Sequence, residues 1–199
     1  MVRIIPFFSG CFFFLVSGCW CNDQIRSTSS LNETELNLVE LPTPSTLNYF
    51  DNLGNSYTAI TSYDGITSET DRLGAESCDI DAFERASSRM FFTTENLPSV
   101  SLDMDSPINN GSSELTLDIR GKDLAGNNIG VRLLYFNQTG SSFTSSQFQT
   151  ISLNGMTFND VIVVNDSFSN SPVDKVLMSL ENGIELILFD DGNFLKLDI

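Results

Sequence analysis

The chain has 199 residues and a mass of 22.0 kDa, and 26 acidic residues against 10 basic ones give it a formal net charge of -16. It contains no histidine, which excludes Ser-His-Asp and Cys-His catalytic groups and every zinc site that needs an imidazole ligand. The negative charge excludes nucleic acid as a partner, because nucleic-acid binding depends on Lys and Arg neutralising phosphates. The content of 41% hydrophobic and 18% charged residues predicts a single folded domain.

The first 18 residues have the pattern of an export signal. Arg3 precedes an apolar stretch from Ile4 to Val16, and small residues follow it. A stretch of about 13 residues is shorter than the roughly 20 needed to cross a bilayer as a helix, so the sequence predicts a cleaved signal peptide over 1–18.

The residues Val16-Ser17-Gly18-Cys19 resemble the lipobox of bacterial lipoproteins. This resemblance implies that Cys19 becomes the mature N-terminus and carries acyl chains such as palmitate. Two or more acyl chains give stable membrane attachment, and Trp20 would then lie at the membrane interface. The implied location is the bacterial cell envelope, in the outer membrane, on its periplasmic face or at the cell surface. The alternative is an ordinary signal peptide, with Cys19 a plain thiol.

Four cysteines are present, and two of them remain after processing. Cys11 leaves with the signal peptide and Cys19 is used by the lipid, which leaves Cys21 and Cys78. They are a candidate disulfide pair in an oxidising compartment, and the alternative is two unpaired thiols. Cys19 and Cys21 lack the further ligands that a metal site would need.

Residues 19–45 are expected to form the lipidated N-terminus and a flexible tether. Their Ser-Thr-Ser-Ser run and Pro42-Thr-Pro44 favour an extended, solvated spacer. In the alternative, the leucines of this stretch form a short helix or an edge strand that docks on the domain; they are Leu31, Leu36, Leu38 and Leu41.

The remaining residues, 46–199, have the pattern of strands and turns. Asp64-Gly65 and Asn154-Gly155 mark expected turns, and only Glu76 to Met90 has helical spacing, so it is expected to be one short helix or a long loop. Alternating or β-branched runs predict strands at 113–119, 129–136 and 161–164.

The C-terminal end gives the clearest pattern. Three apolar runs, at 175–180, 184–189 and 194–197, are separated by Asn182-Gly183 and Asp191-Gly192, which favour tight hairpins. The sequence therefore predicts an all-β domain, an antiparallel β-sandwich or open barrel with a C-terminal β-meander. Residues 154–161 and 176–197 also resemble small lipoproteins of Bacteroidetes-type bacteria, many of which have no known activity.

Three groups of residues are candidates for chemistry. Asp103, Asp105, Asn109 and Asn110 could form an irregular calcium site, although Pro107 and Ile108 break the EF-hand template and a solvated acidic loop is the alternative. Asp79, Asp81 and Glu84 are the densest carboxylates for glycoside hydrolysis. A carbohydrate-stacking platform would come from aromatic residues that otherwise pack in the core: Tyr49, Phe50, Tyr57, Tyr63, Tyr135 and Phe136.

Two classes of function follow. The first is a non-catalytic lipoprotein, anchored in the envelope, that binds an envelope protein, a glycan or an ion or serves as an accessory subunit. The second is a carbohydrate-active or other envelope enzyme that uses paired carboxylates. The absence of histidine favours the first, and we predict no catalytic residue and no cofactor apart from calcium.

Overall fold

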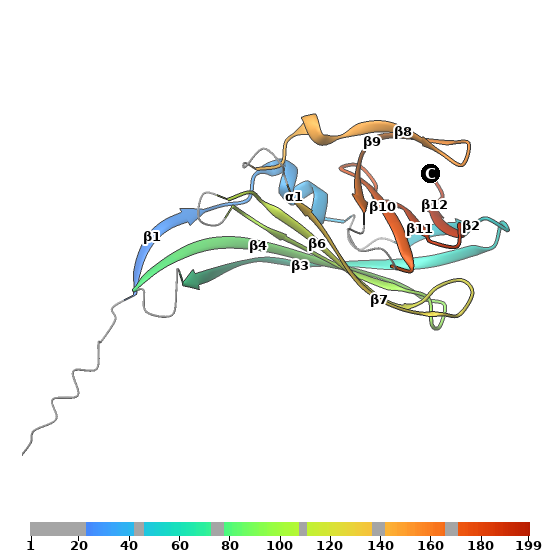
Figure 1. Cartoon of the computed structure of the whole chain (residues 1–199), viewed down its shortest axis with the longest axis horizontal. Coiled ribbons are helices and arrows are strands. Elements are labelled where there is room, and N and C mark those ends of the chain that lie inside the picture. Colours follow the sequence, from blue (N-terminus) through green and yellow to red (C-terminus); the bar gives the residue numbers. More distant parts are fainter. Residues whose placement is uncertain (1–22, 42–45, 73–77, 108–110, 137–141, 166–170) are drawn as a thin grey trace, which may run out of the picture.

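The computed structural model describes residues 23–41, 46–72, 78–107, 111–136, 142–165 and 171–199, and it confirms the all-β prediction. Within these ranges, twelve strands form one sheet in the order β7-β6-β5-β4-β3-β2-β12-β11-β10-β9-β8, with β1 paired to β4. The sheet curls into an open barrel, and neighbours along its path are antiparallel (Figure 1). The elements are β1 (Gln24–Ser29), α1 (Glu33–Val39), β2 (Thr46–Asp51), β3 (Ser56–Arg72), β4 (Asp79–Phe92), β5 (Ser99–Asp105), β6 (Glu114–Lys122), β7 (Asn128–Phe136), a 3-10 turn (Ser145–Gln147), β8 (Gln149–Leu153), β9 (Met156–Asn165), β10 (Val173–Ser179), β11 (Gly183–Phe189) and β12 (Phe194–Leu197).

The predicted C-terminal meander is confirmed. Strands β10, β11 and β12 pair in sequence, and the glycines of the two connecting turns, Gly183 and Gly192, have φ of 70° and 84°. The expected strands at 129–136 and 161–164 lie within β7 and β9, the one at 113–119 matches β6 apart from its first residue, and Asn154-Gly155 forms the turn between β8 and β9. Strand β12 then pairs with β2, which joins the meander to the first half of the sheet.

The expectation of a helix or loop over Glu76 to Met90 is wrong. This segment falls largely in strand β4, which pairs with β3 on one edge and β5 on the other. Along β4, Ala86, Ser88, Met90 and Phe92 are buried while Arg89 and Phe91 between them are exposed, which is the alternation of a strand with one core face. The two neighbouring strands satisfy the backbone N–H and C=O groups of β4, and this tertiary pairing overrides the local helical spacing of its apolar residues.

Asp64-Gly65 is not a turn. It lies inside the long strand β3, where Tyr63 pairs with Ser88 and Gly65 with Ser87, so Asp64 has no partner in the ladder. Gly65 has φ of 95°, a conformation that serves a β-bulge as well as a turn.

The prediction of an extended spacer is also wrong for Gln24 to Leu41, and the docked alternative is confirmed. β1 adds to β4 in parallel, and α1 buries Leu38 and Val39 completely in the barrel interior. The helix begins with a capping box, in which Asn32 and Glu35 satisfy each other's backbone N–H groups. An apolar stripe and an N-cap within a polar segment therefore produced a packed element.

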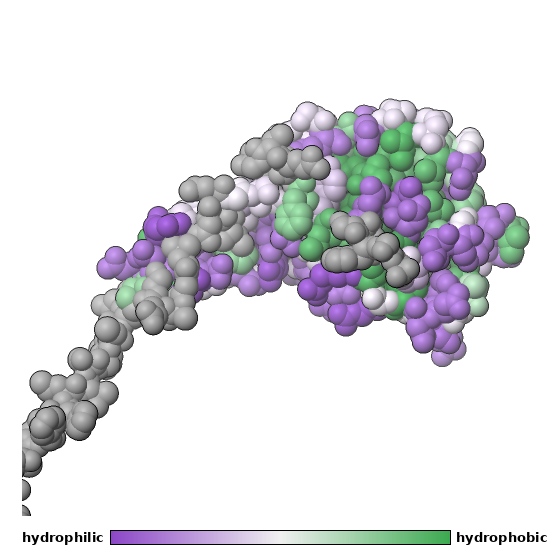
Figure 2. Space-filling model, viewed as in Figure 1, coloured by the Kyte–Doolittle hydropathy of each residue, from purple (hydrophilic) through white to green (hydrophobic). Residues whose placement is uncertain are grey.

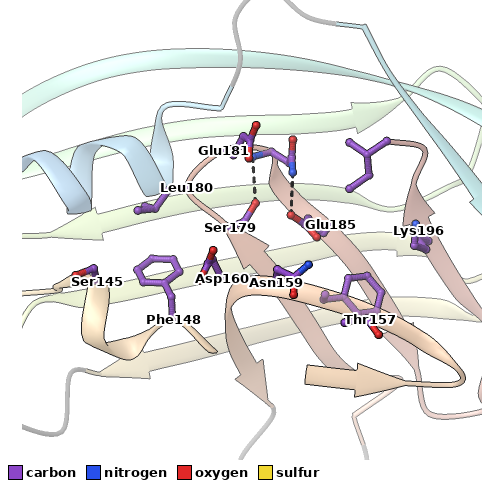
Figure 3. Close-up of a pocket in the computed structure, with 13 residues that line it drawn as sticks. Ser145, Phe148, Thr157, Asn159, Asp160, Ser179, Leu180, Glu181, Glu185 and Lys196 are labelled. Carbon is purple, nitrogen blue, oxygen red and sulfur yellow. Dashed lines mark hydrogen bonds between the residues drawn. The ribbon is translucent and has the colours of Figure 1, made fainter. Parts of the chain in front are cut away.

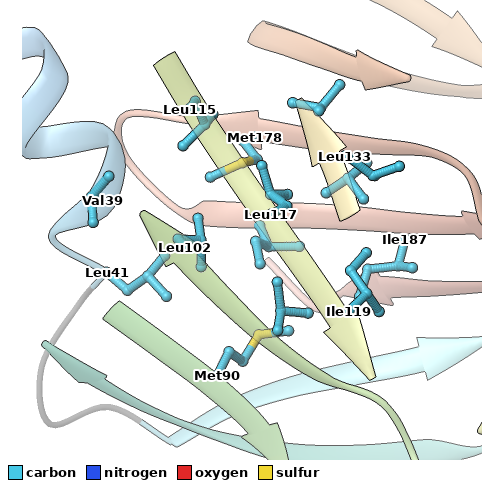
Figure 4. Packing of buried hydrophobic residues seen from close by; sticks show 14 of the residues in the cluster. Val39, Leu41, Met90, Leu102, Leu115, Leu117, Ile119, Leu133, Met178 and Ile187 are labelled. Atoms are coloured by element: carbon cyan, nitrogen blue, oxygen red, sulfur yellow. The ribbon is translucent and has the colours of Figure 1, made fainter. Parts of the chain in front are cut away.

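The sheet carries an apolar cluster on each face near its C-terminal half. The larger fills the barrel, where residues of α1, β4 to β7 and β10 to β12 meet (Figure 4). The smaller lies on the opposite face, because successive side chains of a strand alternate: Val176 and Met178 point into the barrel, and Leu177 points out. The β8–β9 hairpin covers this outer cluster, so the chain is an open barrel with a local two-layer sandwich.

Candidate functional site

The residues proposed for lipid attachment and disulfide formation lie mostly outside the described part of the chain. Cys19 and Cys21 belong to 1–22, whereas Cys78 is described and is disulfide-bonded. The Gln24 N–H donates to the Cys78 carbonyl at 2.9 Å, which places the chain just after Cys21 beside Cys78. This proximity fits the Cys21–Cys78 pairing, which stays a prediction. Within the described ranges, no helix is both long and apolar enough to cross a bilayer.

The predicted carboxylate group is structural. Asp81 accepts hydrogen bonds from the Ser27 hydroxyl and from Arg26, and Glu84 accepts one from the Leu31 N–H at 3.0 Å. These bonds fasten β1 and the start of α1 to β4. Asp81 and Glu84 therefore hold the N-terminal segment on the barrel, and they do not face each other across a cleft.

The predicted calcium ligands are engaged with other side chains. Asp103 and Asp105 lie on β5; Arg85 donates to both Asp105 oxygens, at 2.5 and 2.7 Å, and the Ser87 hydroxyl donates to Asp103 at 2.6 Å. Asn109 and Asn110 fall outside the described residues. No group of three or more metal-binding side chains occurs among those that the structure describes.

The predicted aromatic platform is not assembled. Tyr49 is fully buried, contacts Phe92 edge to face at 5.2 Å and donates its hydroxyl proton to the Ile184 carbonyl at 2.6 Å. Tyr63 and Tyr135 also pack against the barrel core. The Tyr57 hydroxyl bonds Asp51 at 2.9 Å, Phe136 is exposed on β7, and Phe50 lies on the outer face beside Phe194. Most of these rings therefore serve packing.

A cleft lined by both apolar and charged side chains lies elsewhere, between the β8–β9 hairpin and the ends of β10, β11 and β12. It has a volume of about 470 Å³. Apolar side chains on its wall are Phe148, Phe158, Leu180 and Ile199, and the charged ones are Asp160, Glu181, Glu185 and Lys196 (Figure 3). Figure 2 shows apolar surface between this hairpin and the strands below it, bordered by polar residues. Apolar walls with a few converging polar groups are typical of ligand sites.

A bulge in β9 creates the cleft. Gln149 pairs with Val161 and Ile151 pairs with Phe158, so Asn159 and Asp160 on β9 lie opposite the single residue Thr150 on β8, and β9 has one extra residue at this point. Asp160 has φ of 50°, which is uncommon for a residue with a side chain. The bulge bends β9, so that its first half turns over the outer face of the sheet while its second half pairs with β10.

Glu185 is the buried acid of the cleft. It sits at a second bulge, because Leu177 pairs with Leu186 and Met178 with Ile184, leaving Glu185 unpaired in the ladder. Its side chain is buried, with 4% of the residue exposed, and Oε1 accepts one hydrogen bond from the Asn182 amide at 3.0 Å. None of the ion pairs among the described residues includes Glu185.

Among the described residues that line this cleft, Lys196 is the one with a basic group. Its Nζ lies 5.0 Å from the centre of the Phe50 ring and 5.8 Å from that of Phe158, and it donates to the Leu197 carbonyl at 3.2 Å. Aromatic faces attract an ammonium group through their quadrupole. Lys196 is therefore held by rings and a carbonyl oxygen, and it leaves Glu185 without a counter-charge.

A second hollow of about 470 Å³ lies on the outer face of β3, β4 and β5. Both of its arginines are already in ion pairs: Arg85 with Asp105 and Glu69, and Arg89 with Asp64. A ligand would have to displace these pairs, which makes the first cleft the better candidate site.

No protein-family model matches the chain, and neither a curated protein nor a solved structure matches it. The candidate site is therefore inferred from its geometry alone. The cleft is not predicted from the sequence pattern, although Glu185 gives one signal: it is a single charged residue in the apolar run Ile184 to Phe189.

Proposed function

We propose that the protein is a non-catalytic binding module, held in a bacterial cell envelope by a lipid anchor on Cys19. The lipobox at Val16 to Cys19 supports the anchor. The observation that carries the binding function is the cleft under the β8–β9 hairpin, where an apolar wall surrounds a buried carboxylate with one neutral hydrogen-bond partner. A charge buried in this way is costly unless a partner compensates it, so a ligand that supplies the partner is favoured.

The anchor is tested by Cys19→Ala with cell fractionation. The substituted chain should move from the membrane fraction to the soluble fraction, because the acyl chains supply the attachment. Cys78→Ser, which leaves the lipobox intact, is the control and should stay with the membrane. Unchanged partitioning of Cys19→Ala would refute the anchor.

The binding function is tested by blocking the cleft. Asn159 is exposed in the cleft wall, and Asn37 is exposed on α1, away from it. A small-molecule extract of the native envelope should raise the melting temperature of the wild-type chain and of Asn37→Trp, because bound ligand stabilises the folded state, but not that of Asn159→Trp. Equal shifts in both variants, or no shift in the wild type, would contradict the proposal.

An envelope hydrolase is the second candidate, because two carboxylates, Asp160 on β9 and Glu185 on β11, line the same cleft (Figure 3). Asp160 and Glu181 are exposed, however, whereas the general acid of such enzymes lies in an apolar pocket. Release of reducing sugars from envelope glycans by the wild type and not by Glu185→Gln would establish the enzyme.

A further inference from the structure

The charges of the cleft define which ligands it accepts. Three acids, Asp160, Glu181 and Glu185, face one base, Lys196, and the whole chain carries a formal charge of -16. A negative field of this kind raises the local concentration of cations and repels anions. Anionic ligands such as phosphates and free carboxylates are therefore disfavoured.

Glu185 provides the specific contact. Its Oε1 is oriented by the Asn182 side-chain amide, and the Asn182 N–H is itself bonded to the Ser179 hydroxyl at 3.1 Å. The turn between β10 and β11 thus holds the carboxylate in place before any ligand arrives. The second oxygen, Oε2, has no hydrogen bond to a described residue, so it can accept one from a ligand.

Part of the cleft wall is apolar and aromatic. Phe148 on the hairpin side and Leu180 on the sheet side line the cleft (Figure 3), and the Phe158 ring lies 5.8 Å from Lys196 Nζ. A ligand that fills this space buries an apolar body against these side chains and places its polar head at Glu185.

We propose that the cleft binds a primary ammonium group carried on an apolar chain, with the ammonium donating to Glu185 Oε2 and the chain lying between Phe148 and Leu180. This inference rests on the proposed binding function and adds the chemical class of the ligand. A free aliphatic amine and a lysine side chain of a peptide share this chemistry. Charge-assisted hydrogen bonds to a buried carboxylate are about twice as strong as neutral ones, which makes the ammonium head the discriminating feature.

The test uses the full chain in a neutral detergent and isothermal titration calorimetry. Three probes share one apolar body and differ in the head group: 4-phenylbutylamine, 4-phenylbutanol and 4-phenylbutyrate. The amine should bind at least about tenfold more tightly than the alcohol, and the carboxylate should not bind. Glu185→Gln keeps the acceptor for Asn182 and removes the charge, so it should weaken amine binding by about tenfold or more. Glu95→Gln, an exposed acid outside the cleft, should leave it within about twofold.

A second arm separates the two sources of the ammonium group. A capped Phe-Lys dipeptide that binds more tightly than 4-phenylbutylamine, and loses this advantage on acetylation of the lysine, would assign the group to a peptide. The reverse order would assign it to a free amine.

The ammonium inference and the binding function can fail separately, and these experiments distinguish the two failures. Equal binding of the amine and the alcohol, abolished by Asn159→Trp and unaffected by Glu185→Gln, overturns the ammonium inference and leaves the binding function standing. If no probe binds, the ammonium inference falls as well. The binding function falls with it only if the envelope extract also fails to stabilise the wild-type chain.

Discussion

Glu35 offers the sharpest test of how α1 is held in the barrel. The residue is fully buried, and its carboxylate accepts hydrogen bonds from the Asn32 N–H at 2.8 Å, the Phe143 N–H at 2.9 Å and the Ser113 hydroxyl. Asn32 adds a bond from its side-chain amide to the Phe143 carbonyl at 2.9 Å. One carboxylate therefore joins the helix to the start of β6 and to the segment before β8.

The expected effect of Glu35→Ala follows from the donors that it leaves behind. Phe143 and Ser113 are both fully buried, and an unsatisfied buried donor costs about 1 to 3 kcal/mol. Two such donors predict a loss on the order of 4 kcal/mol in the free energy of unfolding. Glu35→Gln keeps one acceptor oxygen but turns an NH₂ group towards a donor. Its free energy of unfolding should therefore fall by less, about 1 to 3 kcal/mol.

Urea denaturation followed by circular dichroism measures these losses, with Glu33→Ala as the matched control. Glu33 lies in the same first turn of α1 but is exposed, so its removal should cost only about 0.3 to 1 kcal/mol through the helix dipole. If Glu35→Ala and Glu33→Ala differ by less than about 1 kcal/mol, the reasoning about the buried carboxylate is refuted.

Two further predictions concern the disulfide and the tyrosines. If Cys21 pairs with Cys78, both should resist alkylation until a reductant is added, and mass spectrometry should recover their linked peptides; recovery of Cys78 linked to another cysteine would refute the pairing. The pKa of each of the four tyrosines is raised, with burial as the main cause, so the folded state favours the neutral phenol. Their contribution to stability should be complete below about pH 10 and be lost as the pH rises through the raised values. Tyrosinate absorbance should therefore appear together with alkaline unfolding, and a normal titration in the folded chain would contradict this.

The local sequence pattern was sufficient to predict much of the fold. The Asn-Gly and Asp-Gly pairs that separate apolar runs located β10, β11 and β12, because positive φ at a turn and alternation along a strand are properties of a few adjacent residues. The composition likewise excluded histidine chemistry and nucleic acid without reference to any contact.

Long-range pairing decided the rest. β4 has helical spacing, yet β3 and β5 on its two edges make it a strand, and the polar segment of Gln24 to Leu41 is ordered because β4 and the barrel interior accept β1 and α1. The cleft depends on two bulges, at Asp160 and Glu185, whose register is defined only by their partner strands. The sequence alone thus determined the fold class, the C-terminal meander and the excluded chemistries, because these follow from composition and neighbouring residues. Only the tertiary structure decided that Glu185 is buried in the wall of a cleft with a single hydrogen bond, because that depends on which residues, distant in the chain, surround it.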